Sequence, residues 1–159
     1  MPSGDNLDVY LRDIHEIRTL KASYCELADR CCSPAGARVA ADEIIKLFVE
    51  DGTLEVPAEY GGRQIGRAGI HAFWMRQSLA FSFADHIAFN ERIDVDGAMA
   101  RGRWKNMIPV TTDVGGRSVS LWILGDYADE YVKVDGQWRI RSVKVTIRRV
   151  FSRDDTSPL

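Results

Sequence analysis

The heptapeptide "YCELADR", residues 24–30, carries an acidic side chain in a segment that is otherwise apolar enough to be buried. Such a carboxylate either turns toward solvent or faces an interior cavity in which its charge has a chemical role. Asp29 is therefore the first candidate functional residue. His86 is the second, because the proton equilibrium of histidine lies near neutral pH and the ring can both accept and return a proton. The chain has two other histidines, His15 and His71, and both fall in predicted helices.

The position of Asp29 on its predicted helix leaves two interpretations open. A helix turns by about 100° per residue, so Tyr24 and Asp29 lie about 140° apart around the axis and do not share a face. Asp29 then lies at the edge of the apolar stripe. It is either an exposed aspartate beside Arg30 at a helix end, or a carboxylate that faces a pocket.

His86 opens the segment "DHIAFNERIDVDG", residues 85–97, which has the character of a strand. Side-chain alternation places His86 opposite Ile87 and Phe89, on the less apolar of the two faces. Strand parity alone therefore does not predict that His86 is buried, and a lone surface histidine is the alternative.

Length and composition indicate a single globular domain. The chain has 159 residues, of which 45% are hydrophobic and 28% charged, and this is enough to enclose a pocket. A net charge of −2 provides no basic surface of the kind that binds nucleic acid. Arg101, Arg103 and Lys105 occupy alternate positions, as on an exposed strand face. No run approaches the roughly 18 apolar residues of a membrane span, so we expect no membrane partner and a cytoplasmic location.

The sequence predicts neither a metal nor another cofactor. Cys25, Cys31 and Cys32 have the spacing of neither a disulfide framework nor a zinc site, and we expect small buried side chains. The glycines of "YGGRQIG" are not followed by the Lys-Ser or Lys-Thr of a phosphate loop.

Apolar periodicity predicts three helices before the β-rich part of the chain. Apolar residues recur every three or four positions from Leu7 to Cys31, which predicts a first helix there. A second helix is predicted over 39–52, ending at Gly52. A short strand over 53–57, a glycine-rich turn over 60–66 and a third helix over 67–81 follow.

Four long β-type runs are predicted over 85–97, 98–112, 117–136 and 137–151. The dipeptides Asp96-Gly97 and Asp135-Gly136 are hairpin signals and predict an antiparallel meander. Helices followed by strands predict an α+β fold, with the helices grouped on one face of a curved sheet.

This order of elements, together with "GRQIGRAGI", "DHIAFNERIDVDG" and "DGQWRI", resembles the SnoaL-like branch of the nuclear transport factor two-like superfamily. The resemblance covers about residues 7–150 and looks nearest to scytalone dehydratase, bile acid 7α-dehydratase and hexachlorocyclohexane dehydrochlorinase. It implies a conical α+β barrel, in which a strongly curved, mostly antiparallel sheet wraps around the N-terminal helices and leaves a deep apolar pocket. One domain would span 1–159, with short flexible ends.

The resemblance also implies three catalytic residues. In the resembling dehydratases a Tyr or Lys five residues before an Asp belongs to the active site, and Tyr24 and Asp29 match the Tyr form. A His at the position of His86, followed four residues later by Asn, is their general base. The Asp would fix one imidazole nitrogen as a donor and stabilise the imidazolium. Tyr24 would donate a hydrogen bond to an oxygen that gains charge or departs, or it is simply a packed aromatic.

Three further residues are predicted to contact the substrate. Asn106 falls near the position where relatives place a second polar pocket residue, although the hairpin lengths differ. Trp104 shares its strand face, and Tyr127 resembles another pocket position. Ordinary sheet core is the alternative for Trp104.

The chain departs from the resembling proteins at one position. Some relatives place a pocket Arg five residues after the Trp that matches Trp138, and here Val143 stands there. Arg141 has the same strand parity and is a candidate replacement. The departure puts in doubt any substrate that needs a cation at this point.

Two functions follow from the resemblance. The first is a cofactor-independent lyase, a dehydratase or related β-eliminating enzyme, or an isomerase, acting on a small hydrophobic cyclic substrate by Asp-His general base catalysis. The second is a non-catalytic module of the same fold that binds a hydrophobic ligand or another protein chain. The resemblance also implies a homo-oligomer, a dimer or trimer, and Trp122 and Phe151 are compatible with its interface. The dyad requires the Asp29 carboxylate within about 2.6–3.2 Å of the His86 ring.

Overall fold

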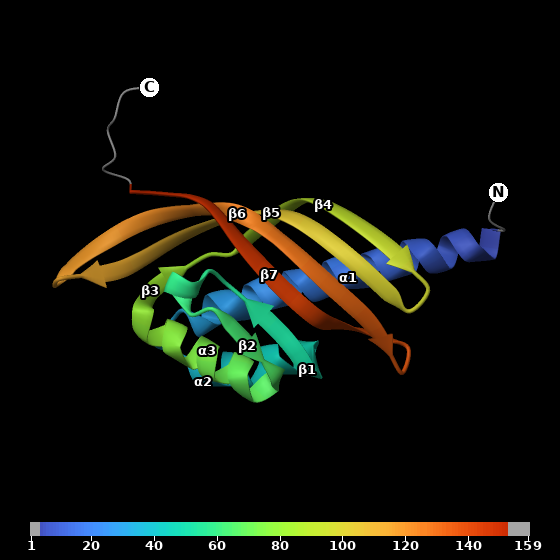
Figure 1. Cartoon of the computed structure of the whole chain (residues 1–159), viewed down its shortest axis with the longest axis horizontal. Helices are drawn as coiled ribbons and strands as arrows, with labels where there is room; N and C mark the ends of the chain where they lie inside the picture. The colour runs from blue at the N-terminus through green and yellow to red at the C-terminus, as the bar shows by residue number, and fades with distance from the viewer. Residues whose placement is uncertain (1–3, 153–159) are drawn as a thin grey trace, which may run out of the picture.

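The computed structural model describes residues 4–152, in which helices and short strands precede four long strands (Figure 1). The helices are α1 (Gly4–Cys31), α2 (Ala37–Ile44) and α3 (Gly66–Ala80), with 3-10 turns η1 (Ile45–Leu47) and η2 (Ala58–Tyr60). The strands are β1 (Phe48–Glu55), β2 (Arg63–Ile65), β3 (Phe81–Ala84), β4 (Ile87–Asp96), β5 (Met99–Val114), β6 (Arg117–Val134) and β7 (Gln137–Ser152). The predicted flexible ends lie mainly outside the described residues.

The seven strands form one curved sheet that does not close on itself. The order is β2-β1-β7-β6-β5, and both β3 and β4 pair with β5. Every pairing is antiparallel except that of β1 with β7. The Asp135-Gly136 turn has positive φ at both residues, 49° and 77°, which is the geometry expected for a two-residue hairpin. The predicted α+β cone and its meander are confirmed, with an open sheet in place of a closed barrel.

The second predicted helix is too long. Helix α2 ends at Ile44, and the chain continues through η1 into β1, so that Gly52 lies within a strand. Pairing of β1 with β7 overrides the local helical pattern, and the register of this pair shifts between Phe48 and Thr53. A Cβ at Gly52 would lie 3.0 Å from the Val49 carbonyl oxygen, so close packing accounts for this glycine. The short strands β2 and β3 were not predicted.

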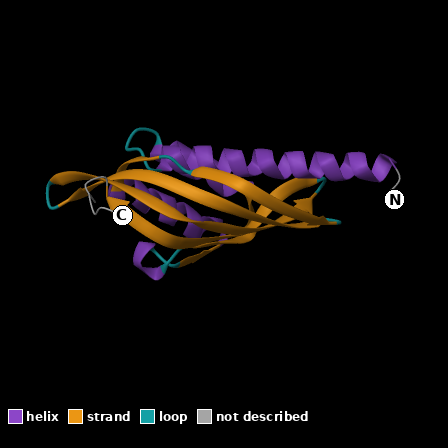
Figure 2. Ribbon diagram, turned by 90° about the horizontal axis from the view of Figure 1, so that it is seen from above, coloured by secondary structure: helices purple, strands orange, loops and turns teal. Residues whose placement is uncertain are grey.

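Helix α1 runs along the sheet, and its N-terminal end extends beyond it (Figures 1 and 2). Its buried residues include Ile17, Lys21, Tyr24 and Ala28, at spacings of four, three and four, which is one helical face. The three cysteines are free and buried, as predicted.

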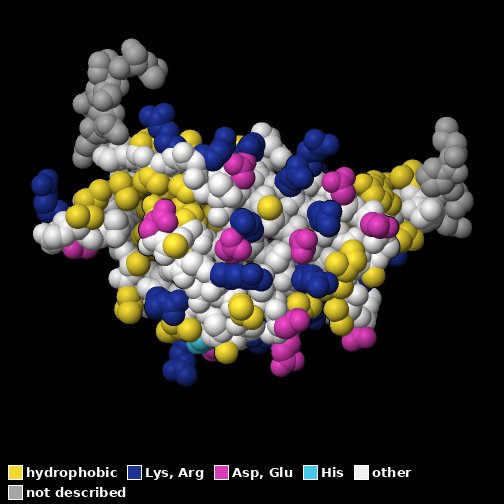
Figure 3. All heavy atoms as spheres, in the orientation of Figure 1, with side chains coloured by type: hydrophobic (Ala, Val, Ile, Leu, Met, Phe, Trp, Pro, Cys, Tyr) yellow, Lys and Arg dark blue, Asp and Glu magenta, His cyan; other side chains and the backbone are white. Residues whose placement is uncertain are grey.

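The surface carries charges of both signs, interspersed over the face shown in Figure 3. Arg101 and Arg103 are exposed, as their alternation predicts. Trp122 and Phe151 stack on neighbouring strands with ring centroids 6.4 Å apart, and Trp122 is partly exposed. Their part in self-association stays a prediction. No helix within residues 4–152 is both long and apolar enough to span a membrane.

Gly125 generates a first prediction about stability. It lies in β6 where the register against β7 shifts, and a Cβ there would come within 2.1 Å of the Thr146 carbonyl oxygen. We therefore expect Gly125→Ala to lower the free energy of unfolding by about 1–3 kcal/mol or more. The matched control is Gly69→Ala in α3, where no heavy atom would lie closer than 3.9 Å to the new Cβ. Because alanine has the higher helix propensity, this change should raise the free energy of unfolding by about 0.5–1 kcal/mol. Urea denaturation of both variants checks this, and equal effects would contradict it.

Asp13 generates a second prediction, on acid stability. This buried carboxylate on α1 accepts hydrogen bonds from the Lys133 ammonium and, at 3.0 Å, from the Trp138 indole. Burial raises the pKa of Asp13, but the two hydrogen bonds and the charges of Lys133 and Arg12 lower it below its ordinary value of 3.8. The ionised Asp13 carboxylate therefore stabilises the folded state above about pH 4, and this contribution is lost as the pH falls through the lowered pKa.

Accordingly, Asp13→Asn should be less stable than the wild type at neutral pH by about 1–3 kcal/mol. The difference should narrow as the pH falls below 3.8. Denaturation curves of both proteins from neutral to acid pH measure it, and a constant difference would show that the carboxylate charge does not contribute.

Candidate active site

The side chains of Asp29 and His86 meet at the end of α1. Asp29 Oδ1 lies 2.7 Å from His86 Nδ1 and also accepts the backbone N–H of His86 at 2.6 Å. The distance between carboxylate and ring lies within the range of about 2.6–3.2 Å that the predicted dyad requires. Two hydrogen bonds to one oxygen fix both the main chain and the ring of His86.

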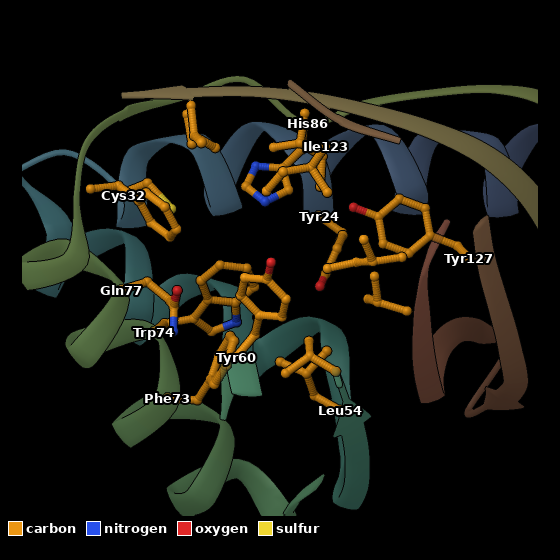
Figure 4. Close-up of a pocket in the computed structure, with 17 residues that line it drawn as sticks. Tyr24, Cys32, Leu54, Tyr60, Phe73, Trp74, Gln77, His86, Ile123 and Tyr127 are labelled. Atoms are coloured by element: carbon orange, nitrogen blue, oxygen red, sulfur yellow. The ribbon is translucent and has the colours of Figure 1, made fainter. Parts of the chain in front are cut away.

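The chemistry of the carboxylate sets the tautomer of the ring. An ionised carboxylate can only accept, so Nδ1 of His86 carries the hydrogen in this contact. In the neutral imidazole, Nε2 then holds a free lone pair. The His86 ring is among the residues that line the interior cavity, and Figure 4 shows it there. In that tautomer the ring that lines the cavity carries one nitrogen able to accept a hydrogen.

His86 lies at an interruption between two strands of the sheet. Strands β3 and β4 both pair with β5, and His86 lies in the two-residue joint between them. At this joint the Asp85 N–H donates to the Pro109 carbonyl oxygen at 3.1 Å, and proline has no N–H to donate in return. The hydrogen-bond ladder is thus incomplete where His86 leaves it. Asn90 of β4 has a φ of 52° at the next irregularity, a conformation that asparagine tolerates well.

His86 borders two different spaces, the interior cavity and an outer cleft, whereas Asp29 borders only the cleft. A cleft outside the cavity is lined by α1 and β4–β5 residues, including Asp29, His86, Arg18 and Glu26. The Asp29 side chain is 29% exposed, whereas that of His86 is 11% exposed. The carboxylate therefore keeps contact with water while the ring it orients also lines the cavity.

The interior cavity is mostly apolar, and its lining comes from α1, α3, η2 and strands β1, β3, β5, β6 and β7, with further residues from the segments that join elements. It has a volume of about 80 Å³ and is partly open to solvent. Figure 4 shows side chains from α1, α3, β1 and the long strands pointing into it. Its lining residues are Tyr24, Cys32, Leu54, Val56, Tyr60, Phe73, Trp74, Gln77, Phe81, Ala84, His86, Ile108, Val110, Ile123, Tyr127, Val145 and Ile147.

Tyr24 and Tyr127 both line the cavity and pack edge to face, with ring centroids 6.4 Å apart. Burial raises the pKa of both phenols well above the ordinary value of 10.0. Both therefore stay protonated at neutral pH and can donate a hydrogen bond. Burial likewise raises the pKa of the Cys32 thiol to about 12, which keeps it from acting as a thiolate.

Two other predicted contact residues do not line this cavity. Trp104 is buried and lines the outer cleft, together with Asp29 and His86. Asn106 is 1% exposed, pairs with Gly125 of β6, and its amide nitrogen and oxygen have no partner within the described residues. Contact of Trp104 or Asn106 with a ligand stays a prediction.

Arg141 does not replace the missing pocket arginine. The register between β6 and β7 shifts between Glu130 and Tyr131, and this reverses the strand parity of β7 at Arg141. Ile140 and Val143 are both buried as a result, while Arg141 is exposed in a groove with Glu55 and Glu130. None of the described residues that line the cavity supplies a lysine or arginine at this point.

A buried ion pair between α1 and β6 was not predicted. Lys21 Nζ lies 2.8 Å from Asp129 Oδ2, with both side chains almost fully buried, and the Tyr131 hydroxyl donates to the same oxygen at 2.7 Å. The ammonium also lies 3.4 Å from the ring centroid of Tyr127. The sequence did contain a signal for this pair. Lys21 is four residues after Ile17 on the buried face of α1, and Asp129 has the same strand parity as two buried tyrosines, so both charges could have been predicted to be buried.

Several cavity residues were also missed by sequence reasoning. Trp74 and Gln77 lie on α3, which was predicted only as an amphipathic helix, and Tyr60 lies in a segment predicted as a turn. No sequence signal separates such residues from ordinary core. Within residues 4–152, no group of three or more His, Cys, Asp or Glu side chains is placed to hold a metal ion.

Comparison with known proteins agrees with this architecture. A family profile described as a SnoaL-like domain matches residues 9–144. A variant of Rv3472, a protein of unknown function from Mycobacterium tuberculosis, is 25% identical with a TM-score of 0.72, over 90% of this chain and 76% of that one. A candidate scytalone dehydratase from Novosphingobium aromaticivorans is 22% identical with a TM-score of 0.76, over 91% and 90%. A type 2 hexachlorocyclohexane dehydrochlorinase is 15% identical with a TM-score of 0.80, over 97% of each chain. None of the curated protein sequences matches.

The Lys21–Asp129 pair generates a prediction about stability. Lys21→Met leaves the Asp129 carboxylate buried without its counter-ion, so we expect it to lower the free energy of unfolding by about 3–5 kcal/mol. In Lys21→Met/Asp129→Asn no charge is buried, and the amide oxygen can still accept from Tyr131, so most of the loss should be recovered. Urea denaturation of the two variants measures this, and a double variant no more stable than the single one would contradict it.

Proposed function

Because the chain belongs to the SnoaL-like domain family, we propose that it is a cofactor-independent lyase or isomerase that acts on a small hydrophobic cyclic substrate. The lyase would be a dehydratase or a related β-eliminating enzyme. The observation that carries the proposal is the Asp29–His86 hydrogen bond of 2.7 Å beside an apolar cavity. Two of the similar structures, a candidate scytalone dehydratase and a dehydrochlorinase, support the reaction class.

His86 is the general base in this proposal. Its Nε2 lone pair takes a proton from an activated carbon of the substrate, and the ring becomes an imidazolium. Asp29, which accepts from Nδ1–H, orients the ring and stabilises that positive charge. The solvent contact of the carboxylate lowers the cost of keeping it ionised before proton transfer.

The electron pair of the broken C–H bond then has two destinations. In elimination it forms a carbon–carbon double bond while the bond to the leaving group breaks, and a departing hydroxide takes the proton from the imidazolium to leave as water. In isomerisation the electrons shift the double bond, and the imidazolium returns the proton to a different carbon. Either route restores neutral His86 without an external oxidant or reductant.

Tyr24 is the hydrogen-bond donor to the oxygen that gains charge or departs. It lines the same cavity as His86, and burial raises its pKa, so its phenol stays protonated. A donor held in place before the reaction stabilises developing negative charge at little reorganisation cost. Tyr127, which packs against Tyr24, is the proposed wall of the substrate site.

A non-catalytic module that binds a hydrophobic ligand is the alternative. It would need the apolar cavity but not an oriented base within it. A readout that follows turnover and binding separately therefore distinguishes the two functions.

We expect the wild type to convert neutral cyclic probes to a conjugated enone. Cyclohexanone with a β-hydroxyl group tests elimination, and cyclohex-3-enone tests isomerisation, since both yield cyclohex-2-enone with its ultraviolet absorbance. Asp29→Asn and His86→Gln should lower the rate by about 10²–10⁴-fold, because each removes the oriented base. Probe affinity should change by less than about twofold, because most of the cavity wall is intact.

The chain offers a matched control in a second histidine–aspartate pair. His71 Nε2 lies 2.9 Å from Asp42 between α2 and α3, outside the cavity. His71→Gln and Asp42→Asn should leave conversion unchanged. Unchanged conversion in Asp29→Asn would exclude the dyad, and probes that bind to the wild type without being converted would favour the binding module.

A further inference from the structure

The walls of the cavity carry no formal charge apart from any proton held by His86. None of the 17 lining residues is Asp, Glu, Lys or Arg. The nearby Lys21 ammonium is paired with Asp129 and lies behind Tyr127, outside the lining. A carboxylate or phosphate on a ligand would lose its hydration without gaining a counter-ion here, which is costly. The cavity therefore favours an uncharged ligand.

Trp74 lines the cavity beside the two proposed catalytic side chains and carries a donor that no described residue accepts from. Its indole projects from α3, with ring centroids 6.0 Å from both Tyr24 and His86 (Figure 4). Trp74 is 3% exposed, and its Nε1 has no hydrogen-bond partner in the described part of the chain. A buried indole N–H normally has an acceptor, as in Trp138, whose Nε1 donates to Asp13 at 3.0 Å. A buried indole N–H without an acceptor costs free energy comparable to a lost hydrogen bond.

We propose that Trp74 donates a hydrogen bond from Nε1 to an oxygen of an uncharged substrate, and so selects oxygenated rings over hydrocarbon and halocarbon rings. The inference rests on the proposed function for the presence of a ligand beside His86. It adds the substrate class, a neutral carbocycle with a carbonyl or hydroxyl oxygen. Carbon-bound halogens are much weaker acceptors than oxygen, so a halogenated ring without oxygen would leave the donor unsatisfied.

Trp74 is the donor whose chemistry best suits this selection. The indole can only donate, so it cannot turn to accept from a ligand, whereas the tyrosine hydroxyls and the Gln77 amide can do both. Its rigid ring is also held edge to face by Phe73, at a centroid distance of 5.1 Å. The position of the acceptor relative to His86 is therefore set by the fold, and Trp74 acts as a specificity-determining residue.

Three bicyclic probes of similar shape test the proposal by binding alone. They are tetralin, which has no acceptor, 1-tetralone, which has a ketone oxygen, and tetralin-1-carboxylate, which is charged. We expect 1-tetralone to bind most tightly and the carboxylate to bind at least about tenfold more weakly than the ketone. In Trp74→Phe the ratio of the tetralin and tetralone dissociation constants should fall about fivefold, the loss of one neutral hydrogen bond.

The change in this ratio separates the hydrogen bond from the loss of ring area, because the smaller Phe weakens the binding of both probes. Trp122→Phe, on the outer face of the sheet, is the control and should leave the ratio unchanged. If Trp74→Phe does not fold, the wild type still gives a readout. Its Trp74 indole N–H resonance should move downfield on adding 1-tetralone and not on adding tetralin.

An unchanged ratio in Trp74→Phe, or an indole resonance that responds equally to both probes, would overturn the proposal. Tight binding of the carboxylate would overturn the claim of an uncharged ligand. None of these readouts requires turnover. The proposed preference of Trp74 for oxygenated ligands can therefore be correct even if the protein converts no probe. It can also be wrong in a protein whose Asp29–His86 pair is catalytic.

Discussion

Three ionisable residues of α1 fix where this helix lies against the sheet. Asp13 pairs with Lys133 and Trp138, Lys21 with Asp129, and Asp29 with His86, at intervals of eight residues or about 12 Å along the axis. A slide of α1 by one turn, about 5.4 Å, would leave at least two of these charges buried without partners, which costs several kcal/mol each. The apolar stripe alone tolerates such a slide far better, because hydrophobic contact is non-directional.

The position of α1 in turn determines the site. With the helix fixed, its last turn brings the Asp29 carboxylate to the joint between β3 and β4, where the sheet has lost a hydrogen bond at Pro109 and the chain is free to turn His86 inward. The same helix presents Tyr24 to the cavity. The side chains proposed to act together thus come from a helix end, a strand joint and α3, and all of them depend on one packing arrangement.

Much of the fold was predictable because its signals are local. The periodicity of 7–31 predicted α1, and Asp135-Gly136 predicted a turn whose φ angles are those of a two-residue hairpin. The errors lie where pairing between distant segments overrides local pattern. Gly52 was predicted to end a helix but lies in β1, which pairs with β7 nearly a hundred residues later. Whether Arg141 faces the pocket was left open on strand parity, which a bulge in the pairing with β6 reverses.

The sequence by itself determined the identity of the chemical groups, the helix that carries Tyr24 and Asp29, and the family to which the chain belongs, because side-chain chemistry and helical periodicity are properties of short segments. Only the tertiary structure decided that His86 faces inward while Ile87 and Phe89 are partly exposed, since strand alternation assigns two faces but does not say which one the helices cover. It also decided that Lys21 is buried against Asp129 and that the Trp74 indole is left without an acceptor among residues 4–152. These outcomes depend on which distant atoms come within hydrogen-bond reach, and that is fixed only when α1, α3 and the curved sheet pack together.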